Sequence, residues 1–159
     1  MVSVEMLGLD LDGVVIDLSL LKRRIKGRHI REEDTILAPL EELPPVPGVY
    51  EVFDLGWVKA IITRRLLRSP VEQWFRHWFG KVLVPVYCIG PNGDKAEKCK
   101  ELGIEVFVDD DYFVVEHLKG YGIRGLWFTV EKDGNLYEFL KREGVLFEKE
   151  LEGGGGNDR

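Results

Sequence analysis

Short apolar runs alternate with helical patterns along most of the chain, and this alternation limits the possible folds more than any other feature. The apolar runs are residues 2–11, 57–63, 81–89, 104–109 and 123–128. Short runs without strict polar alternation are typical of parallel strands that are buried on both faces. Strands and helices in alternation imply right-handed crossovers, so the sequence predicts an α/β fold with a parallel sheet.

Helix signals separate these runs. Residues 69–80 begin with an N-cap serine, a proline at the first helical position and a glutamate three residues after the cap. A second helix is expected over residues 94–103, and two more after Gly48 and over residues 112–119. The aromatic residues of the first of these helices are expected to pack on the sheet: Trp74, Phe75, Trp78 and Phe79.

Two regions interrupt the alternation. Residues 17–46 form an insertion after the first run, with a helical first half and a proline-containing loop. Residues 129–151 predict a terminal helix or hairpin that covers a sheet edge, and residues 152–159 predict a flexible, glycine-rich tail. At roughly one domain per 150 residues, the 159-residue chain is expected to form one domain over residues 1–151.

Composition excludes several classes of protein. The sequence has 22 Lys and Arg residues and 28 Asp and Glu residues. The resulting net charge of −6 excludes a wholly basic protein that coats DNA. Cys88 and Cys99 are too few for a disulfide scaffold and are not spaced as a metal clip, and Cys88 is expected to be buried. The first residues lack a signal-peptide pattern, and no run reaches the ~20 apolar residues that span a bilayer. We therefore expect a cytoplasmic protein without a membrane partner.

Polar residues gather at the ends of the predicted strands. Ligands of parallel α/β sheets bind outside the carboxyl ends of the strands, so these residues are the candidates for chemistry. They are Asp10 and Asp12 after the first run, Thr63 and Arg64 after the second, Asp109, Asp110 and Asp111 after the fourth, and Lys95 in the first turn of a helix. Clustered carboxylates need a countercharge, and hard oxygen ligands suit Mg²⁺.

Each of these signals has a simpler interpretation when taken alone. The acidic motif after the first run could be a turn, but it is not a calcium loop, because Val15 and Leu21 stand where that loop needs Gly and Glu. Residues 109–111 could be a solvated loop with a helix cap, and Lys95 an ordinary exposed lysine. Residues 90–95 are too short for a P-loop.

Taken together and in order, the motifs resemble those of a known family. The sequences LDLDGVV at residues 9–15 and IITR at 61–64, Lys95 at a helix start, and VFVDD at 106–110 resemble the four motifs of the haloacid dehalogenase-like (HAD) phosphohydrolase superfamily. The resemblance spans residues 4–128 and is greatest to small 5′-nucleotidase-like members. It implies a three-layer, Rossmann-like sheet in which residues 17–46 form a small cap.

The resemblance also implies roles for the catalytic residues. Asp10 would attack phosphorus to form an aspartyl-phosphate, and Asp12 would protonate the leaving oxygen and then activate water. Thr63 and Lys95 would hold the phosphoryl oxygens and balance charge, with Lys98 as the alternative lysine. A haloacid dehalogenase needs no acid for the leaving group, so Asp12 favours phosphoryl transfer.

Mg²⁺ is the cofactor that the resemblance implies. Its ligands would be Asp10, the backbone carbonyl of Asp12, and Asp110, with Asp109 binding directly or through water. Since Asp111 is also acidic, the choice among the three consecutive carboxylates stays open at this point.

The predicted cap carries a basic run within residues 22–31. Its members are Lys22, Arg23, Arg24, Lys26, Arg28, His29 and Arg31. Arg23 and Arg24, with Arg64, could bind a phosphorylated substrate, or the run could be the solvated face of a helix offset by the acidic residues that follow. We expect hydrolysis of a small phosphorylated metabolite, which could be a nucleotide. The alternatives are a polynucleotide 3′-phosphatase and a protein that binds a phospholigand or partner without turnover.

Overall fold

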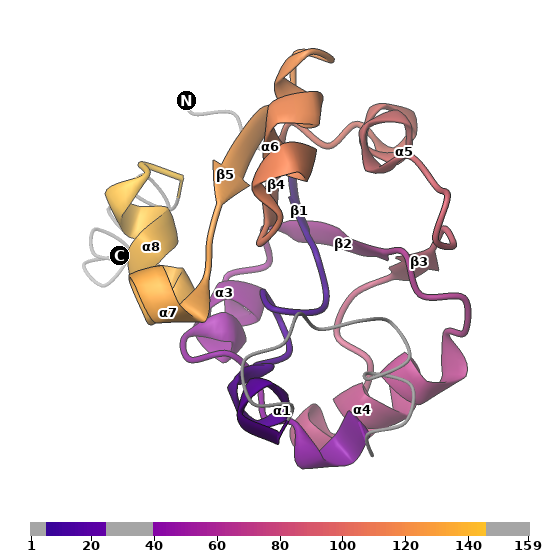
Figure 1. Ribbon diagram of the computed structural model, residues 1–159, viewed down its shortest axis with the longest axis vertical. Helices are drawn as coiled ribbons and strands as arrows, with labels where there is room; N and C mark the ends of the chain where they lie inside the picture. The colour runs from indigo at the N-terminus through magenta and orange to yellow at the C-terminus, as the bar shows by residue number, and fades with distance from the viewer. Residues whose placement is uncertain (1–5, 25–39, 146–159) are drawn as a thin grey trace, which may run out of the picture.

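A five-stranded parallel sheet forms the centre of the computed structural model, which describes residues 6–24 and 40–145 (Figure 1). The strands are β1 (Leu7–Leu9), β2 (Val58–Thr63), β3 (Val86–Cys88), β4 (Val106–Asp109) and β5 (Arg124–Trp127). Their order is β3-β2-β1-β4-β5, and every neighbouring pair is parallel. Because β1 lies in the middle, the chain crosses from one half of the sheet to the other after β3. The predicted α/β fold with a parallel sheet is confirmed.

The strands are shorter than the apolar runs that predicted them. All residues of β1 and β4 are buried, because helices cover both faces of the sheet. The third run, residues 81–89, forms a strand only over Val86–Cys88, after Pro85. Proline has no backbone N–H to donate to a neighbouring strand, which limits strand formation there. Cys88 is half-buried rather than buried, since β3 is an edge strand.

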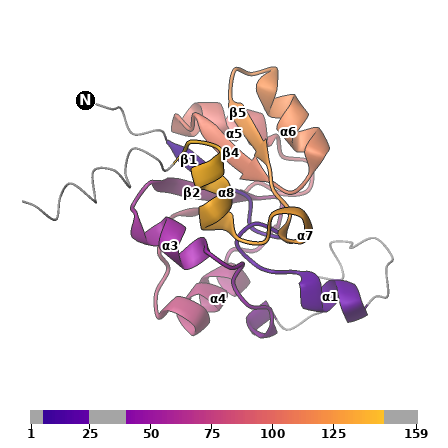
Figure 2. The same ribbon diagram turned by 90° about the vertical axis from the view of Figure 1, so that its left-hand side faces the viewer.

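Helices form a layer on each face of the sheet, as Figure 2 shows. One layer contains α3 (Val49–Asp54), α4 (Ser69–Phe79) and α8 (Leu136–Arg142), whose apolar residues share one core cluster. The other contains α5 (Lys95–Leu102) and α6 (Tyr112–Lys119), which pack in a second cluster. The predicted three-layer arrangement is confirmed.

The helix boundaries confirm most of the capping signals. Asp94 caps α5, and its carboxylate accepts hydrogen bonds from Ala96 N and Glu97 N at 2.9 and 3.3 Å. The prediction for Ser69 is wrong in detail, because Ser69 is the first helical residue and Arg68 stands at the cap position without a side-chain hydrogen bond.

The aromatic face of α4 differs from the prediction at one position. Trp74 and Phe75 are fully buried against the sheet. Trp78 does not pack there: it is 40% exposed, and its indole Nε1 donates to the carbonyl oxygen of Glu41 at 3.1 Å. Helical spacing places Trp78 one turn after Trp74, but the short 3-10 helix η1 (Leu40–Glu42) lies against α4 at that point.

After β5 the chain forms the helices α7 (Val130–Asp133) and α8 rather than a hairpin. The Phe128 and Phe139 rings pack edge to face at 5.2 Å, and α8 contacts α3. The terminal helix therefore covers part of a sheet face beside α3.

The insertion begins with the helix α1 (Ser19–Arg24) and returns through η1. The rest of the predicted cap, residues 25–39, and the predicted tail lie outside the described residues. In the part of the chain that is described, no helix is long and apolar enough to cross a membrane.

Candidate active site

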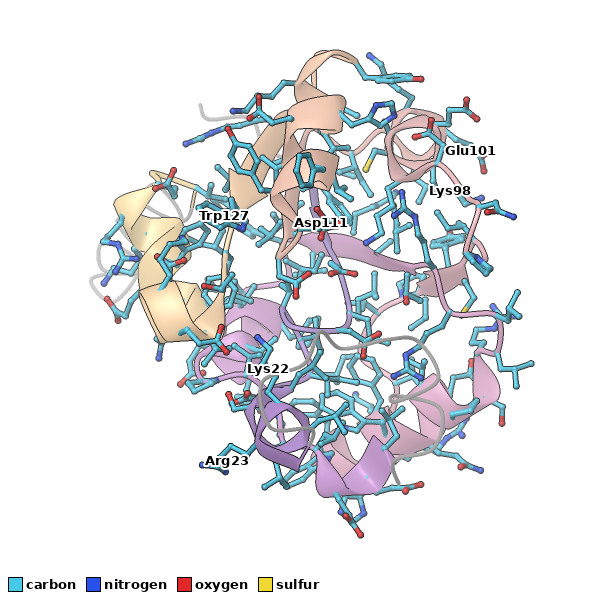
Figure 3. The ribbon with its side chains drawn as sticks, viewed as in Figure 1. Lys22, Arg23, Lys98, Glu101, Asp111 and Trp127 are labelled. Atoms are coloured by element: carbon cyan, nitrogen blue, oxygen red, sulfur yellow. The ribbon has the colours of Figure 1, made fainter. Side chains whose placement is uncertain are left out.

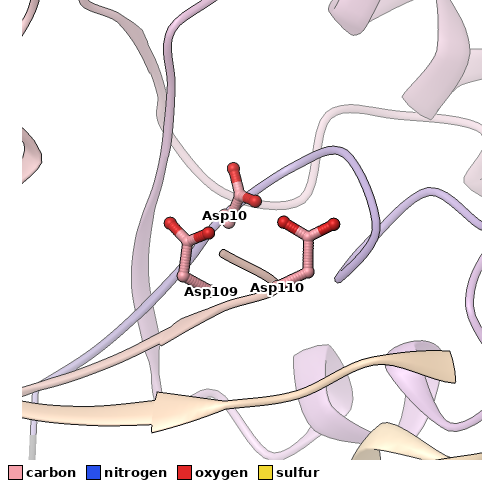
Figure 4. Close-up of side chains that lie close together, drawn as sticks. All are labelled: Asp10, Asp109 and Asp110. Atoms are coloured by element: carbon pink, nitrogen blue, oxygen red, sulfur yellow. The ribbon is translucent and has the colours of Figure 1, made fainter. Parts of the chain in front are cut away.

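Three carboxylates meet at the carboxyl ends of the two central strands. Asp10 follows β1, Asp109 ends β4, and Asp110 comes next. One oxygen from each lies within 4.8 Å of the others (Figure 4). Asp10 and Asp109 are only 6% and 1% exposed. Because β1 and β4 are neighbours in the sheet, the fold brings together residues that are about 100 positions apart in the sequence.

Lys95 lies among these carboxylates. Its Nζ donates to Asp10 Oδ1 at 2.9 Å and to Asp109 Oδ2 at 2.8 Å, and the residue is 5% exposed. Lys95 is the first residue of α5, and the Asp94 cap fixes the start of that helix. Lys98 is one turn further on and pairs with Glu101 at 2.9 Å (Figure 3). Of the two candidate lysines, Lys95 is therefore the one that contacts the carboxylates.

The cluster carries more negative charge than one lysine balances. Burial raises the pKa of Asp10 well above its usual value, and the charge of Asp109 adds to this effect. The same two causes raise the pKa of Asp110 to about 7. Burial lowers the pKa of Lys95, but the charges of Asp10 and Asp109 outweigh burial and raise it overall. A bound cation would relieve this repulsion, and carboxylate oxygens are ligands that suit Mg²⁺.

Hydrogen bonds distinguish the three consecutive aspartates. Asp109 already accepts from Lys95 through Oδ2 and from the backbone N–H of Asp111 through Oδ1. The Asp111 carboxylate accepts from Phe113 N at 2.9 Å and caps α6, so it serves the helix rather than the cluster. Asp110 is thus the best placed of the three to bind a metal ion directly.

The absence of a side chain at Gly13 leaves space for the Asp110 carboxylate. The φ of +89° at Gly13 lies in the left-handed region that favours glycine. A Cβ at this position would collide with the Asp110 carboxylate. The glycine of the LDLDGVV motif is therefore needed both for the turn after β1 and for the close approach of this turn to the Asp110 side chain.

Asp12 is held by an arginine that the sequence analysis did not select. Arg65 Nε donates to Asp12 Oδ2 at 2.9 Å, and Arg65 Nη2 donates to Asp12 Oδ1 at 3.0 Å. The Arg65 side chain is 10% exposed, whereas that of Asp12 is 25% exposed. The predicted Arg64 is exposed instead and donates to the carbonyl oxygen of Gly93 at 3.1 Å.

The signal that could have found Arg65 is the period of an extended chain. Residues two apart in an extended segment share a side, so Arg65 rather than Arg64 follows Thr63 toward the site. Thr63 itself is 2% exposed, and its Oγ1 accepts from Arg65 N at 3.2 Å.

The basic run is described only in part. Lys22 pairs with Glu131 of α7 at 2.9 Å, and both side chains are about half exposed. Arg23 is exposed on α1 (Figure 3). The Arg24 side chain and residues 25–31 lie outside the described residues.

Comparisons with known proteins agree with this architecture. No protein-family model and no curated protein matches the sequence. Among solved structures, a provisionally assigned β-phosphoglucomutase from Thermotoga maritima matches with a TM-score of 0.57 and 20% identity, over 88% of this chain and 98% of that chain. A dehalogenase matches with a TM-score of 0.54 and 12% identity, over 87% of this chain and 91% of that chain.

A third match is CbbY from Rhodobacter sphaeroides in complex with phosphate. Its TM-score is 0.51 at 14% identity, over 77% of this chain and 85% of that chain. These matches give no support to the expected 5′-nucleotidase-like subtype. At such low identity they establish the fold and not the activity. The chain therefore has the HAD-like fold.

Proposed function

We propose that the protein is a Mg²⁺-dependent phosphomonoester hydrolase that acts through an aspartyl-phosphate on a small phosphorylated metabolite. One observation carries the proposal. Asp10 is buried at the end of the central strand, its Oδ1 is held by Leu11 N and Lys95 Nζ, and Asp109 and Asp110 lie beside it. A nucleophile and its charge-balancing groups are thus fixed before any substrate binds.

In the first step, a carboxylate oxygen of Asp10 forms a bond to phosphorus, and the bond from phosphorus to the leaving oxygen breaks. Asp12 gives a proton to that leaving oxygen. Asp12 lies two residues after Asp10, at the turn that Gly13 begins. Both Asp12 oxygens accept hydrogen bonds from Arg65, so Asp12 must release at least one of them before it can carry the proton to the leaving oxygen.

In the second step, water attacks the phosphorus of the aspartyl-phosphate. Asp12 takes a proton from this water, and the bond from phosphorus to the Asp10 oxygen breaks, which releases phosphate and restores Asp10. Lys95 holds Asp10 through both steps, and the Thr63 hydroxyl is assigned to a phosphoryl oxygen. Arg64, Arg23 and Arg24 are assigned to substrate binding.

The metal would be bound by Asp10, Asp110 and the backbone carbonyl of Asp12, with Asp109 directly or through water. When bound, Mg²⁺ neutralises charge that otherwise repels a phosphate dianion from a carboxylate. The donor set consists of hard oxygens. Burial and the charge of Asp109 raise the pKa values of Asp10 and Asp110, and a bound cation would favour their ionised forms.

Asp12 also favours hydrolysis of phosphoesters over dehalogenation, although a dehalogenase shares the fold. A halide leaves without a proton, whereas an alkoxide needs one. A dehalogenase therefore has no use for an acid at this position.

The test is phosphate release from a panel of phosphomonoesters, with Mg²⁺ and with EDTA. Metal-dependent release that Asp10→Asn abolishes is the expected result. Asp111→Asn is the matched control, because Asn caps a helix as well as Asp and Asp111 lies outside the cluster. Equal activity of wild type and Asp10→Asn would refute the proposed nucleophile.

The same panel decides the substrate class. It includes sugar phosphates, 5′- and 3′-nucleotides and a 3′-phosphorylated oligonucleotide. Release from the oligonucleotide alone would identify a polynucleotide 3′-phosphatase. No release by a folded protein that binds Mg²⁺ would favour a binding protein.

A further inference from the structure

Large exposed apolar side chains gather at the edge of the sheet that carries the site. Among the described residues, seven large apolar side chains are exposed. Five of these seven lie at or just after the carboxyl end of a strand. They are Leu66, Leu67, Tyr112, Phe113 and Trp127. Exposed apolar side chains that cluster beside a polar site mark a binding surface.

A groove lies where two of these side chains stand. Leu66 and Leu67 are 67% and 70% exposed and line a cavity of about 840 Å³. The edge strand β3 and Lys98 of α5 also line this cavity. This volume falls within the range of about 300–1,000 Å³ that is usual for small-molecule sites.

The groove adjoins the proposed catalytic residues on two sides. Leu66 is three residues after Thr63, and Ile89, which also lines the groove, donates its N–H to the carbonyl oxygen of Thr63 at 2.9 Å. On the other side, Lys98 is three residues after Lys95, which is about 4.5 Å along a helix. A molecule whose phosphate lies at Asp10 therefore has the groove within reach.

Apolar and polar side chains both line the groove. Leu66, Leu67, Val86 and Ile89 contribute aliphatic surface. Contacts between aliphatic groups favour an apolar ligand in proportion to the area removed from water.

The cations of the groove already have partners. Arg68 lies 3.8 Å from Glu72, and Lys98 pairs with Glu101 at 2.9 Å. The Lys98 ammonium also lies 5.1 Å from the centre of the Tyr87 ring. A second anionic group of a substrate would have to replace these contacts, so the groove fits an uncharged group better.

We propose that this groove binds the leaving group of the substrate, and that this leaving group is uncharged and apolar, aryl or long alkyl, rather than a polyol. The inference rests on the proposed function, because it assigns the part of the molecule that departs from phosphorus. It makes Leu66 and Leu67 the residues that determine specificity.

The test compares 1-naphthyl phosphate with glycerol 1-phosphate. We expect wild type to have the higher kcat/KM for 1-naphthyl phosphate. In the double variant Leu66→Ser/Leu67→Ser, the ratio of the two kcat/KM values should fall about 15-fold, since loss of about two buried methylene contacts costs roughly fourfold each. Both leucines are exposed, so the variant is expected to fold.

Phe113→Ser is the matched control. Phe113 is 81% exposed at the start of α6, at the same edge of the sheet but outside the groove. Its replacement should leave the ratio unchanged. A ratio that falls in Phe113→Ser and not in the double variant would overturn the proposal, and so would a wild type that prefers glycerol 1-phosphate.

Binding separates failure of this inference from failure of the proposed function. Asp10→Asn protein is titrated by calorimetry with 1-naphthyl phosphate and with inorganic phosphate, with and without the two serine substitutions. A loss of affinity of about 15-fold for 1-naphthyl phosphate alone supports the groove even if no variant turns over any substrate. Equal losses for both ligands, or no binding of 1-naphthyl phosphate, would overturn it.

Discussion

Replacing Asp110 with Asn should stabilise the protein at pH 8 when no divalent metal is present. Asp110 lies within 4.8 Å of the Asp10 and Asp109 carboxylates. Burial, and then the charge of Asp109, raise its pKa from 3.8 to about 7. In the folded protein without metal, ionisation of Asp110 is therefore unfavourable, and Asn keeps the shape of the side chain without the charge.

The sign and size follow from this raised pKa. A carboxyl whose pKa is higher in the folded state contributes stability that is fully present below about pH 4 and is lost as the pH rises through about 7. The shift is about three pH units, and each unit corresponds to about 1.4 kcal/mol, so the loss at pH 8 is on the order of 4 kcal/mol. At pH 5 less than half of this loss has occurred.

Urea denaturation at pH 5 and pH 8, with EDTA or with Mg²⁺, measures the effect. In EDTA, Asp110→Asn should exceed wild type in free energy of unfolding, by more at pH 8 than at pH 5. Mg²⁺ should stabilise wild type and have little effect on Asp110→Asn, because a ligand stabilises only the state that binds it. Asp111→Asn, outside the cluster, should behave as wild type. If Asp110→Asn were no more stable than wild type at pH 8 in EDTA, the account of the charge cluster would be wrong.

Three further substitutions test other contacts of the site by the same denaturation assay. Arg65→Met should lower the free energy of unfolding by about 2 kcal/mol, since it removes two charged hydrogen bonds from Asp12. As a control, replacement of the exposed Arg64 with Met should change it by less than about 0.5 kcal/mol. Equal effects of the two substitutions would show that the pair with Asp12 contributes nothing. Lys95→Met should lower the free energy of unfolding by about 3–5 kcal/mol at pH 8 without metal. The loss should be smaller at pH 5, where the carboxylates left unpaired can take up protons. A loss of stability that does not depend on pH would contradict this reasoning. Asp94→Ala should cost about 1 kcal/mol through loss of the α5 cap, and Asp94→Asn should restore most of it, an outcome that a role of the charge alone would not give.

The fold followed from local features of the sequence. The buried strands β1 and β4 were visible as continuous apolar runs, and the start of α5 was visible in Asp94, because burial pattern and capping depend on neighbouring residues. The positions of Asp10, Asp109 and Lys95 at one edge of the sheet followed as well. Parallel strands put their carboxyl ends on the same side, so residues that end them must gather there.

Other features depended on how the elements pack. The sequence could not choose among Asp109, Asp110 and Asp111, since all three are acidic and adjacent; the choice came from the cap of α6 and from the lysine beside Asp109. Trp78 has the spacing of a buried residue, yet η1 lies at its position on α4 and its ring stays partly exposed.

The α/β alternation, the order of the motifs and the strand-end residues can be read from the sequence, because each depends on only a few neighbouring positions. Packing of the elements was needed to pair Arg65 with Asp12 across 53 residues and to bring Leu66 and Leu67 to the groove beside β3. Such contacts join segments distant in the chain. Their partners are set by the direction of each side chain after packing, which no local pattern specifies.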